Sequence, residues 1–344
     1  MKKLFFLCMI CSVMKVTAQQ KPYYTQYILN NYILNPALSG IESYTDVKLS
    51  YRNQWTGIEG APVTTYFSIQ GPLGHSDNIR TTPTSFEKAG VNTMGKDYLD
   101  DYTAPDPHSG VGMIIMNDKT GYISRFSMYG TYAYHKPLGT KTTLSLGFLA
   151  GFTNISLDQS KVVLGDIQYD DAIGYTNGEL KKFQPEIGAG LWLYSKNYYL
   201  GLSALNIVPG KVKFAKTSNT KVGTYYVPTY FVSAGYRFLT NGDISILPSV
   251  SVQSVSPFPL QIHANIKFQY QDLLWFGGSY RITDELGGYA IMAGVNIAHT
   301  INIGYAYDVS TTSRLRAYAG DTHEIIVGFL LNNKYGDSCP RNVW

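Results

Sequence analysis

The residues best suited to acid–base chemistry in this chain are its six histidines, and none of them stands in a recognisable catalytic pattern. Enzymes with a nucleophilic serine, cysteine or threonine hold a base at hydrogen-bonding distance from it. The sequence contains neither a G-x-S-x-G nor an H-E-x-x-H motif. We therefore predict no enzyme activity and no cofactor. We interpret His263 as a polar residue in the lumen of the β-barrel that the strand pattern described below predicts. The histidines are His75, His108, His135, His263, His299 and His323.

Two further groups of residues have side chains that could share a proton or bind a metal ion. His323 and Glu324 are neighbours in a strand-like segment, where adjacent side chains point to opposite faces, which argues against joint catalysis. The acidic residues near position 100 carry oxygen ligands of the kind that Ca²⁺ prefers, but they lack EF-hand spacing and tyrosines interrupt them. We predict a solvated loop and no metal site there. These acidic residues are Asp97, Asp100, Asp101 and Asp106.

The elements that must position these side chains are strands, because apolar and polar residues alternate with a period of two. From Leu260 to Phe268 every second residue is apolar, and the residues between them are polar. We predict about fourteen such strands in one antiparallel up-and-down barrel. They lie near 45–55, 62–71, 110–118, 122–135, 142–153, 184–195, 198–208, 227–238, 243–252, 260–269, 274–282, 288–297, 301–308 and 325–331.

Composition separates a membrane barrel from the other classes. Charged residues make up 15% of the chain, against about a quarter in ordinary soluble proteins. There are 29 tyrosines and 33 glycines, and no long apolar run follows residue 18, as a helical membrane protein would require. These features are typical of a transmembrane barrel, whose lipid-facing residues are spread over alternate positions.

Residues 1–18 have the layout of a signal peptide, with Lys2 and Lys3 before a short apolar core and a small residue at the end. The residues before Cys8 and Cys11 are too large for a lipoprotein site. Removing this segment takes away three of the 28 basic residues, which leaves 25 against 24 acidic ones. A nearly neutral chain offers no nucleic-acid footprint, and Cys339 alone cannot form an internal disulfide.

The connections between the predicted strands alternate in length. Gaps near 136–141, 196–197, 239–242, 269–273 and 298–300 are short. Those near 154–183, 209–226, 253–259, 283–287 and 310–323 are mostly longer, and this alternation is typical of periplasmic turns and extracellular loops. The insertion at 72–109 falls on the short-turn side, so we expect a periplasmic loop that is available to a partner. We expect the barrel over 45–332 and a tail over 333–344.

The segment 19–44 precedes the first predicted strand. Tyr24, Tyr27 and Ile28 can share one face of a short helix, and Pro36 disfavours helix at Asn35. Two placements stay open for this segment: a plug in the lumen or a periplasmic extension.

Alternate positions of each predicted strand face the lumen, and several of them carry charged side chains. These charges must pair or stay hydrated there. Either ion pairs brace a hydrated wall, or these charges hold an inserted segment or a partner. The inward charges are Lys48, Arg52, Arg237, Lys267, Arg281, Asp308 and Glu324.

Several short pieces of the sequence resemble one family. The most specific are Tyr24-Thr25-Gln26-Tyr27, Asn35-Pro36-Ala37, Tyr51-Arg52-Asn53-Gln54-Trp55 and Gly60-Ala61-Pro62. Weaker ones are Gly110-Val111-Gly112, Tyr132-Ala133-Tyr134, Gly277-Gly278-Ser279-Tyr280-Arg281 and Gly304-Tyr305-Ala306-Tyr307-Asp308. The chain resembles the PorP/SprF family, barrel proteins associated with the type IX secretion system of Bacteroidota.

The resemblance implies an outer-membrane component that helps to export proteins or to hold them at the cell surface. Its expected partners are outer-membrane lipid, the secretion machinery, and a secreted gliding adhesin or the C-terminal domain of such cargo. A passive or substrate-specific channel remains the alternative. The candidate partner-binding or lumen residues are Tyr27, Asn35, Pro36, Arg52, Trp55, Arg237, Lys267 and Arg281.

Overall fold

The computed structural model describes most of the barrel and part of the segment before it. The described residues are 27–74, 102–158, 179–208, 210–212, 224–240, 244–256, 258–270, 273–283, 287–297, 300–311 and 320–332. The predicted signal peptide, His75, His299, most of the acidic cluster and Cys339 lie outside these ranges.

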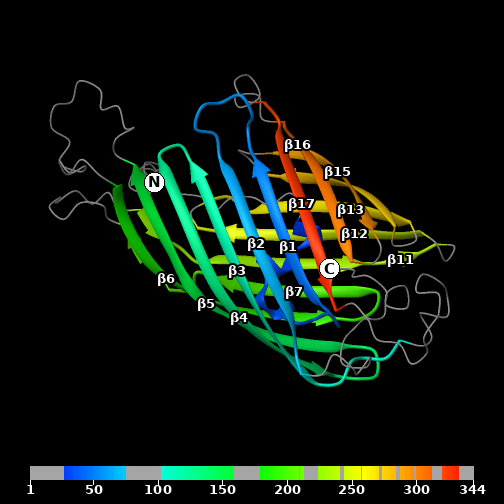
Figure 1. Cartoon of the computed structure of the whole chain (residues 1–344). Helices are drawn as coiled ribbons and strands as arrows, with labels where there is room; N and C mark the ends of the chain where they lie inside the picture. Colours follow the sequence, from blue (N-terminus) through cyan, green and yellow to red (C-terminus); the bar gives the residue numbers. More distant parts are fainter. Residues whose placement is uncertain are drawn as a thin grey trace, which may run out of the picture.

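The described strands form one closed antiparallel barrel, which confirms the predicted fold (Figure 1). Closure comes from β1, which pairs with β17 from Thr45 opposite Leu331 to Asn53 opposite His323. The strands are β1 (Thr45–Asn53), β2 (Val63–Leu73), β3 (His108–Thr120), β4 (Ile123–Pro137), β5 (Thr143–Asp158), β6 (Glu179–Tyr194), β7 (Tyr198–Leu205), β10 (Thr229–Tyr236), β11 (Phe238–Leu239), β12 (Ile244–Val255), β13 (Gln261–Tyr270), β14 (Leu274–Ile282), β15 (Gly288–Ile297), β16 (Ile301–Ser310) and β17 (Thr322–Leu331).

Each of the fourteen predicted strands has a counterpart, once β10 and β11 are taken as one strand interrupted at Arg237. Both pieces pair with β12. The prediction missed this break because Arg237 keeps the alternation: its side chain points inward and is buried.

Several strands extend beyond their predicted ends, most of all β5 and β6. β5 and β6 remain paired out to Asp158 opposite Glu179, and β2 and β3 out to Leu73 opposite Ser109. The loop predicted at 154–183 is therefore 159–178, and the insertion predicted at 72–109 begins after Leu73 and ends before His108. Alternation fades at these strand ends, whereas backbone hydrogen bonding does not depend on side-chain type.

The loop predicted at 209–226 contains a small hairpin, β8 (Gly210–Val212) with β9 (Thr224–Tyr226). Strands this short carry too few residues for alternation to reveal them.

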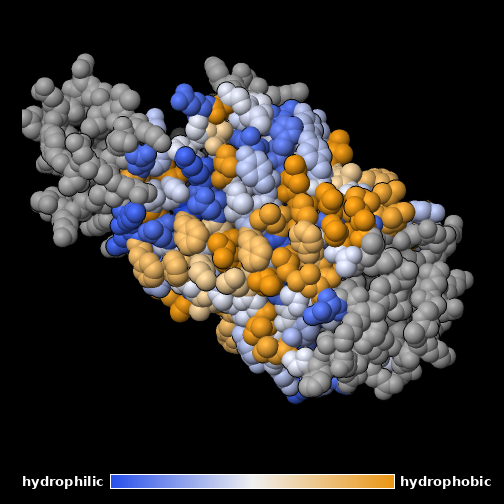
Figure 2. Space-filling model, viewed as in Figure 1, coloured by the Kyte–Doolittle hydropathy of each residue, from blue (hydrophilic) through white to orange (hydrophobic). Residues whose placement is uncertain are grey.

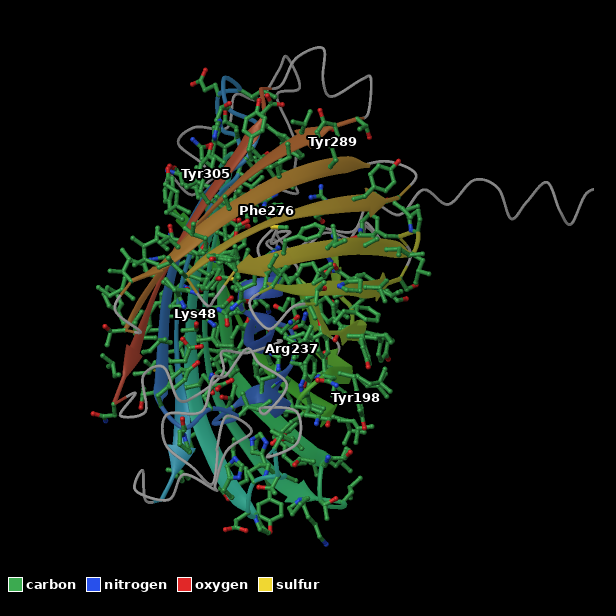
Figure 3. The ribbon with its side chains drawn as sticks, turned by 90° about the vertical axis from the view of Figure 1, so that its right-hand side faces the viewer. Lys48, Tyr198, Arg237, Phe276, Tyr289 and Tyr305 are labelled. Atoms are coloured by element: carbon green, nitrogen blue, oxygen red, sulfur yellow. The ribbon has the colours of Figure 1, made fainter. Side chains whose placement is uncertain are left out.

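Alternation sorts the side chains as predicted. Outward-facing residues such as Phe276 and Ile291, each 62% exposed, are apolar, whereas inward-facing ones such as Ser145 and Thr153 are buried and polar. Figure 2 shows the outward apolar side chains as a band across the middle of the barrel wall. Tyr289 of β15 and Tyr305 of β16 lie on neighbouring strands and are exposed on the outer face (Figure 3). Among the described residues no helix is long and apolar enough to cross a membrane.

One end of the barrel carries the short turns between β4 and β5, β6 and β7, β11 and β12, β13 and β14, and β15 and β16. The start of β1, the end of β17 and the connection between β2 and β3 lie at this end too, as strand parity predicts. We call it the short-turn end, and the opposite one the loop end.

Residues 27–44, which we call the plug, lie inside the barrel (Figures 1 and 3). They form three short 3₁₀ turns, η1 (Tyr27–Leu29), η2 (Asn31–Ile33) and η3 (Pro36–Leu38). Asn35 is extended, with φ −143° and ψ 112°, as expected for a residue before proline. Apolar plug residues such as Ile33, Leu38 and Ile41 are buried together with inward side chains of the wall.

Candidate functional site

The plug is fixed to the wall most specifically through Asn35, one of the candidate residues. Its Nδ2 donates to the carbonyl oxygens of Leu191 on β6, at 3.0 Å, and of Leu202 on β7, at 3.1 Å. Its Oδ1 accepts from the backbone N–H of Ala37 at 3.0 Å and so caps η3. The Asn35 side chain therefore accepts a hydrogen bond from the first turn of η3 and also bridges β6 and β7. Pro36 occupies the first position of η3.

The end of the plug is held by a second network, centred on His135 of β4. The Nε2 of His135 lies 2.9 Å from the Ser39 carbonyl oxygen, and its Nδ1 lies 3.0 Å from the Tyr194 hydroxyl. The ring also stacks in parallel on that of His108, with centroids 4.5 Å apart. No sequence pattern predicts this role. Parity places His135 inward, but no local signal links it to Ser39, which is 96 residues away.

Hydrogen bonds from the other plug residues reach further round the wall. The Tyr32 hydroxyl lies 2.6 Å from the Thr131 hydroxyl of β4. Asn30 Nδ2 donates to the Ser68 hydroxyl of β2 at 3.1 Å. On the far side Tyr27 is hydrogen bonded to Asn265 of β13 and meets the His263 ring edge-on, with centroids 5.8 Å apart. Contacts on several sides of the lumen hold the plug in one position.

Glycines in the wall let the plug pack closely against the strands. A Cβ on Gly147 of β5 would overlap the backbone of Ala37, and a Cβ on Gly190 of β6 would overlap the side chain of Asn35. The inward glycines in this half of the barrel therefore act as a seat for the Asn35-Pro36-Ala37 segment.

Ion pairs occupy the opposite part of the wall. Arg52 Nη1 lies 2.9 Å from Glu324 Oε2, and Arg52 Nη2 lies 3.3 Å from Asp308 Oδ2. Arg281 Nη2 approaches the same Asp308 oxygen at 2.6 Å. Two cations and two anions thus connect β1, β17, β16 and β14, and Arg52 and Glu324 are among the most buried residues of the chain. Because each buried charge faces an opposite charge, their attraction offsets part of the free-energy cost of removing them from water.

The remaining candidate residues do not join this cluster. Trp55 follows β1 in a turn at the loop end, with φ +55°. Its backbone N–H donates to the Thr322 hydroxyl at 3.2 Å. Arg237 lies at the short-turn end, where its Nη2 donates to the Lys196 carbonyl oxygen at 2.7 Å. Lys267 Nζ lies 6.0 Å from the centre of the Trp275 ring. The eight candidates therefore form one charged group, one plug group and separate single positions.

A further polar group, which no sequence motif marks, lies on β4, β5 and β6. Buried Glu186 accepts hydrogen bonds from the Tyr129 hydroxyl at 2.8 Å and from the Thr153 hydroxyl at 2.5 Å. Strand parity places Glu186 inward. The predicted strand begins only at residue 184, however, so too few residues precede Glu186 for alternation to mark it.

His263 and His323 lie on opposite faces of the barrel wall. His263 points into the lumen, as expected. His323 faces outward with its Nδ1 2.6 Å from the Tyr305 hydroxyl, while Glu324 points inward, which confirms that the two occupy opposite faces. Within the described ranges no group of three or more histidine, cysteine or acidic residues is placed to hold a metal ion.

Some solved structures share weak similarity with this chain. The structures that it resembles include the TodX deltaS2S3 mutant monoaromatic hydrocarbon channel, with 10% identity over 92% of this chain and 96% of that one and a TM-score of 0.48. The Ralstonia pickettii toluene transporter TbuX shares 11% identity over 89% and 93%, with a TM-score of 0.47. None of the curated proteins compared with the chain matches it significantly.

The family comparison covers nearly the whole sequence. The family model described as "Type IX secretion system membrane protein PorP/SprF" matches residues 16–329. That range contains the plug, all eight candidate residues and the barrel strands except the last two residues of β17. This chain is an outer-membrane-type β-barrel that belongs to the PorP/SprF family of type IX secretion system membrane proteins.

Proposed function

We propose that this protein is a non-enzymatic, protein-binding component of type IX secretion that assists the export or the surface attachment of secreted adhesins. In this proposal the short-turn end faces the periplasm and the loop end faces the outside, as in other outer-membrane barrels. The partners are the secretion machinery and a secreted adhesin or its C-terminal domain. The proposed partner surfaces are the loops at 159–178, 209–226 and 311–321 outside, and the connection at 74–107 on the periplasmic side. Residues 27–44 are not among them, because they are buried in the lumen.

The observation that carries the proposal is the plug. Its residues are buried in the lumen and hydrogen bonded to β2, β4, β6, β7 and β13. A passive pore needs a hydrated path through the barrel, whereas a lumen occupied by a fixed segment supports a protein whose work is done at its two ends. Family membership points to the same class of function.

The structure limits how the candidate residues can serve this role. Arg52 and Arg281 already pair with acidic residues, and Asn35 already binds the wall. We propose that these residues hold the plug and the wall in shape, so that the two ends are presented correctly. Trp55 lies at the loop end and is half-buried, which makes it the candidate best placed to touch an exported partner.

Deletion of the gene tests the proposal. Secretion of adhesins, their amount on the cell surface and gliding should all fall, and the intact gene should restore them. Complementation with Trp55→Ala should restore the barrel in the membrane but not the full amount of surface adhesin. Unchanged secretion, surface adhesin and gliding in the deletion strain would contradict the proposal.

Affinity purification of the full chain from the native envelope, followed by mass spectrometry, should recover a secreted adhesin or a part of the machinery. An unrelated outer-membrane barrel with the same tag is the control.

The channel alternative has its own test. Purified protein in planar bilayers should show little conductance if the plug stays in place. Steady conductance by the unaltered protein would favour a channel.

A further inference from the structure

A cavity lies in the lumen on the loop-end side of the plug. About 60 Å³ of it is open to the centres of water-sized molecules, and it continues into solvent. Its floor is the plug, through Tyr27, Ile33 and Leu34, and its walls come from strands β3 to β13. Roughly 10–15 Å³ of such space holds one water molecule, so the cavity has room for several waters or for a small molecule that displaces them.

The wall of this cavity is unusually apolar for the inside of a membrane barrel, which is normally polar. Leu149 of β5 and Leu205 of β7 point inward and line it. Met116 of β3 and Phe231 of β10 do the same and are only partly buried, so each keeps apolar surface toward the cavity. Packing against the plug therefore does not account for all of this apolar surface.

The charged groups at the cavity already face polar groups of the protein. Glu186 accepts hydrogen bonds from Tyr129 and Thr153. Arg125 lies directly opposite Asp118 in the pairing of β4 with β3. A guest would therefore gain most from contact with apolar side chains, and a charge on it would lose its hydration for little return.

We propose that this cavity is a binding site for a neutral, mainly apolar small molecule that enters from the loop end. The guest would pack against Leu149, Leu205, Met116 and Phe231, with hydroxyl and amide groups of Ser251 and Gln253 at its border. This site goes beyond the proposed role in secretion and does not depend on it.

A cysteine placed in the cavity tests the site directly. The chain has three cysteines, so Cys8→Ala, Cys11→Ala and Cys339→Ser give a background without thiols. In lipid nanodiscs, Ser251→Cys should react with N-ethylmaleimide, and naphthalene should slow the reaction. At ten times its half-saturating concentration naphthalene should slow it by about tenfold, as simple mass action requires. Naphthalene-2-carboxylate has the same rings with a negative charge and should protect much less.

Two variants locate the effect. Asn302→Cys lies beside the polar cavity on the other side of the plug, and naphthalene should leave its reaction rate unchanged. Gln253→Trp, with Ser251 kept, should fill the space and weaken naphthalene binding at least tenfold by fluorescence.

Several results would overturn the proposal. One is a Ser251→Cys thiol that the reagent cannot reach, because a guest must take the same path. Another is equal protection of Asn302→Cys, which would show partition into lipid only. Equal protection by the carboxylate would show an anion site, and protection only by an added partner polypeptide would show that the cavity receives a protein.

Discussion

Arg52 and Glu324 face each other across the pair of strands that closes the barrel, with Arg52 Nη1 2.9 Å from Glu324 Oε2. They are separated by 272 positions in the sequence. Their contact lies where the first strand meets the last, so the same ion pair belongs both to the wall of the lumen and to the closure of the fold.

Replacing Arg52 should destabilise the barrel strongly. Arg52→Ala leaves Glu324 buried without the cation that it pairs with, and it removes one of the two cations beside Asp308. Breaking a buried pair from one side costs about 3 kcal/mol or more. Guanidinium unfolding in lipid vesicles would measure the loss. Arg52→Lys should lose less because it keeps the charge. Lys136→Ala, an exposed outward position, is the control, and equal stability of Arg52→Ala and this control would refute the pairing.

Replacing Asn35 should loosen the plug while leaving the barrel closed. Asn35→Ala removes two hydrogen bonds to the wall and one cap, each worth about 1 kcal/mol. Hydrogen exchange at residues 27–44 should become faster, and exchange in the strands should change little. Asn154→Ala, on the outward face of β5, serves as the control. Unchanged protection of the plug in Asn35→Ala would show that these bonds do not hold it.

Adding a side chain at Gly147 should displace the plug by steric overlap. Gly147→Val places its Cβ in the backbone of Ala37, whereas a Cβ on Gly139, in the β4–β5 turn, meets nothing within 4 Å. Gly147→Val should therefore raise single-channel conductance in planar bilayers, and Gly139→Val should match the unaltered protein. If the two variants conduct alike, the seat described for the plug is wrong.

A charge introduced on the lipid-facing surface should destabilise the barrel more at the middle of the bilayer than near its edges. Ile291 lies near the middle of β15 and is 62% exposed, so Ile291→Arg should cost about 2–4 kcal/mol. Tyr289→Arg, close to the loop end of the same strand, should cost about 1 kcal/mol or less. Folding into vesicles of increasing bilayer thickness measures both. Equal costs at the two positions would argue against a membrane around this part of β15.

The plug tyrosines should make stability fall in alkali. Burial raises the pKa of Tyr32 above its ordinary value, and hydrogen bonds to Thr131 and Ser39 offset only part of this effect. Above about pH 10 the unfolded chain releases the phenolic proton and the folded protein keeps it, so the free energy of unfolding falls as pH rises. Denaturant unfolding at pH 9 and pH 11 measures the slope. Tyr32→Phe should reduce it, and a slope as steep as in the unaltered protein would assign the effect to other groups.

Much of the fold could be predicted from the sequence because a strand that separates lipid from a polar interior must alternate. The segment from Leu260 to Phe268 shows this most clearly, and each outward or inward position there has the predicted side. Prediction failed where that requirement ends. The ends of β5 and β6 pair beyond the alternating region, and the β8–β9 hairpin is too short to leave a pattern.

By itself the sequence determined the class of fold, the approximate number of strands, the side of the wall that each charge occupies and the family. All of these depend on local patterns or on short motifs. It left open which residues meet, because contacts such as that between His135 and Ser39 depend on how the closed barrel brings distant strands around the plug. Only the tertiary structure placed residues 27–44 in the lumen, paired Arg52 with Glu324 and Asp308, and left an apolar cavity on the loop-end side. The reason is that closure fixes distances between residues far apart in the chain, which a local pattern does not encode.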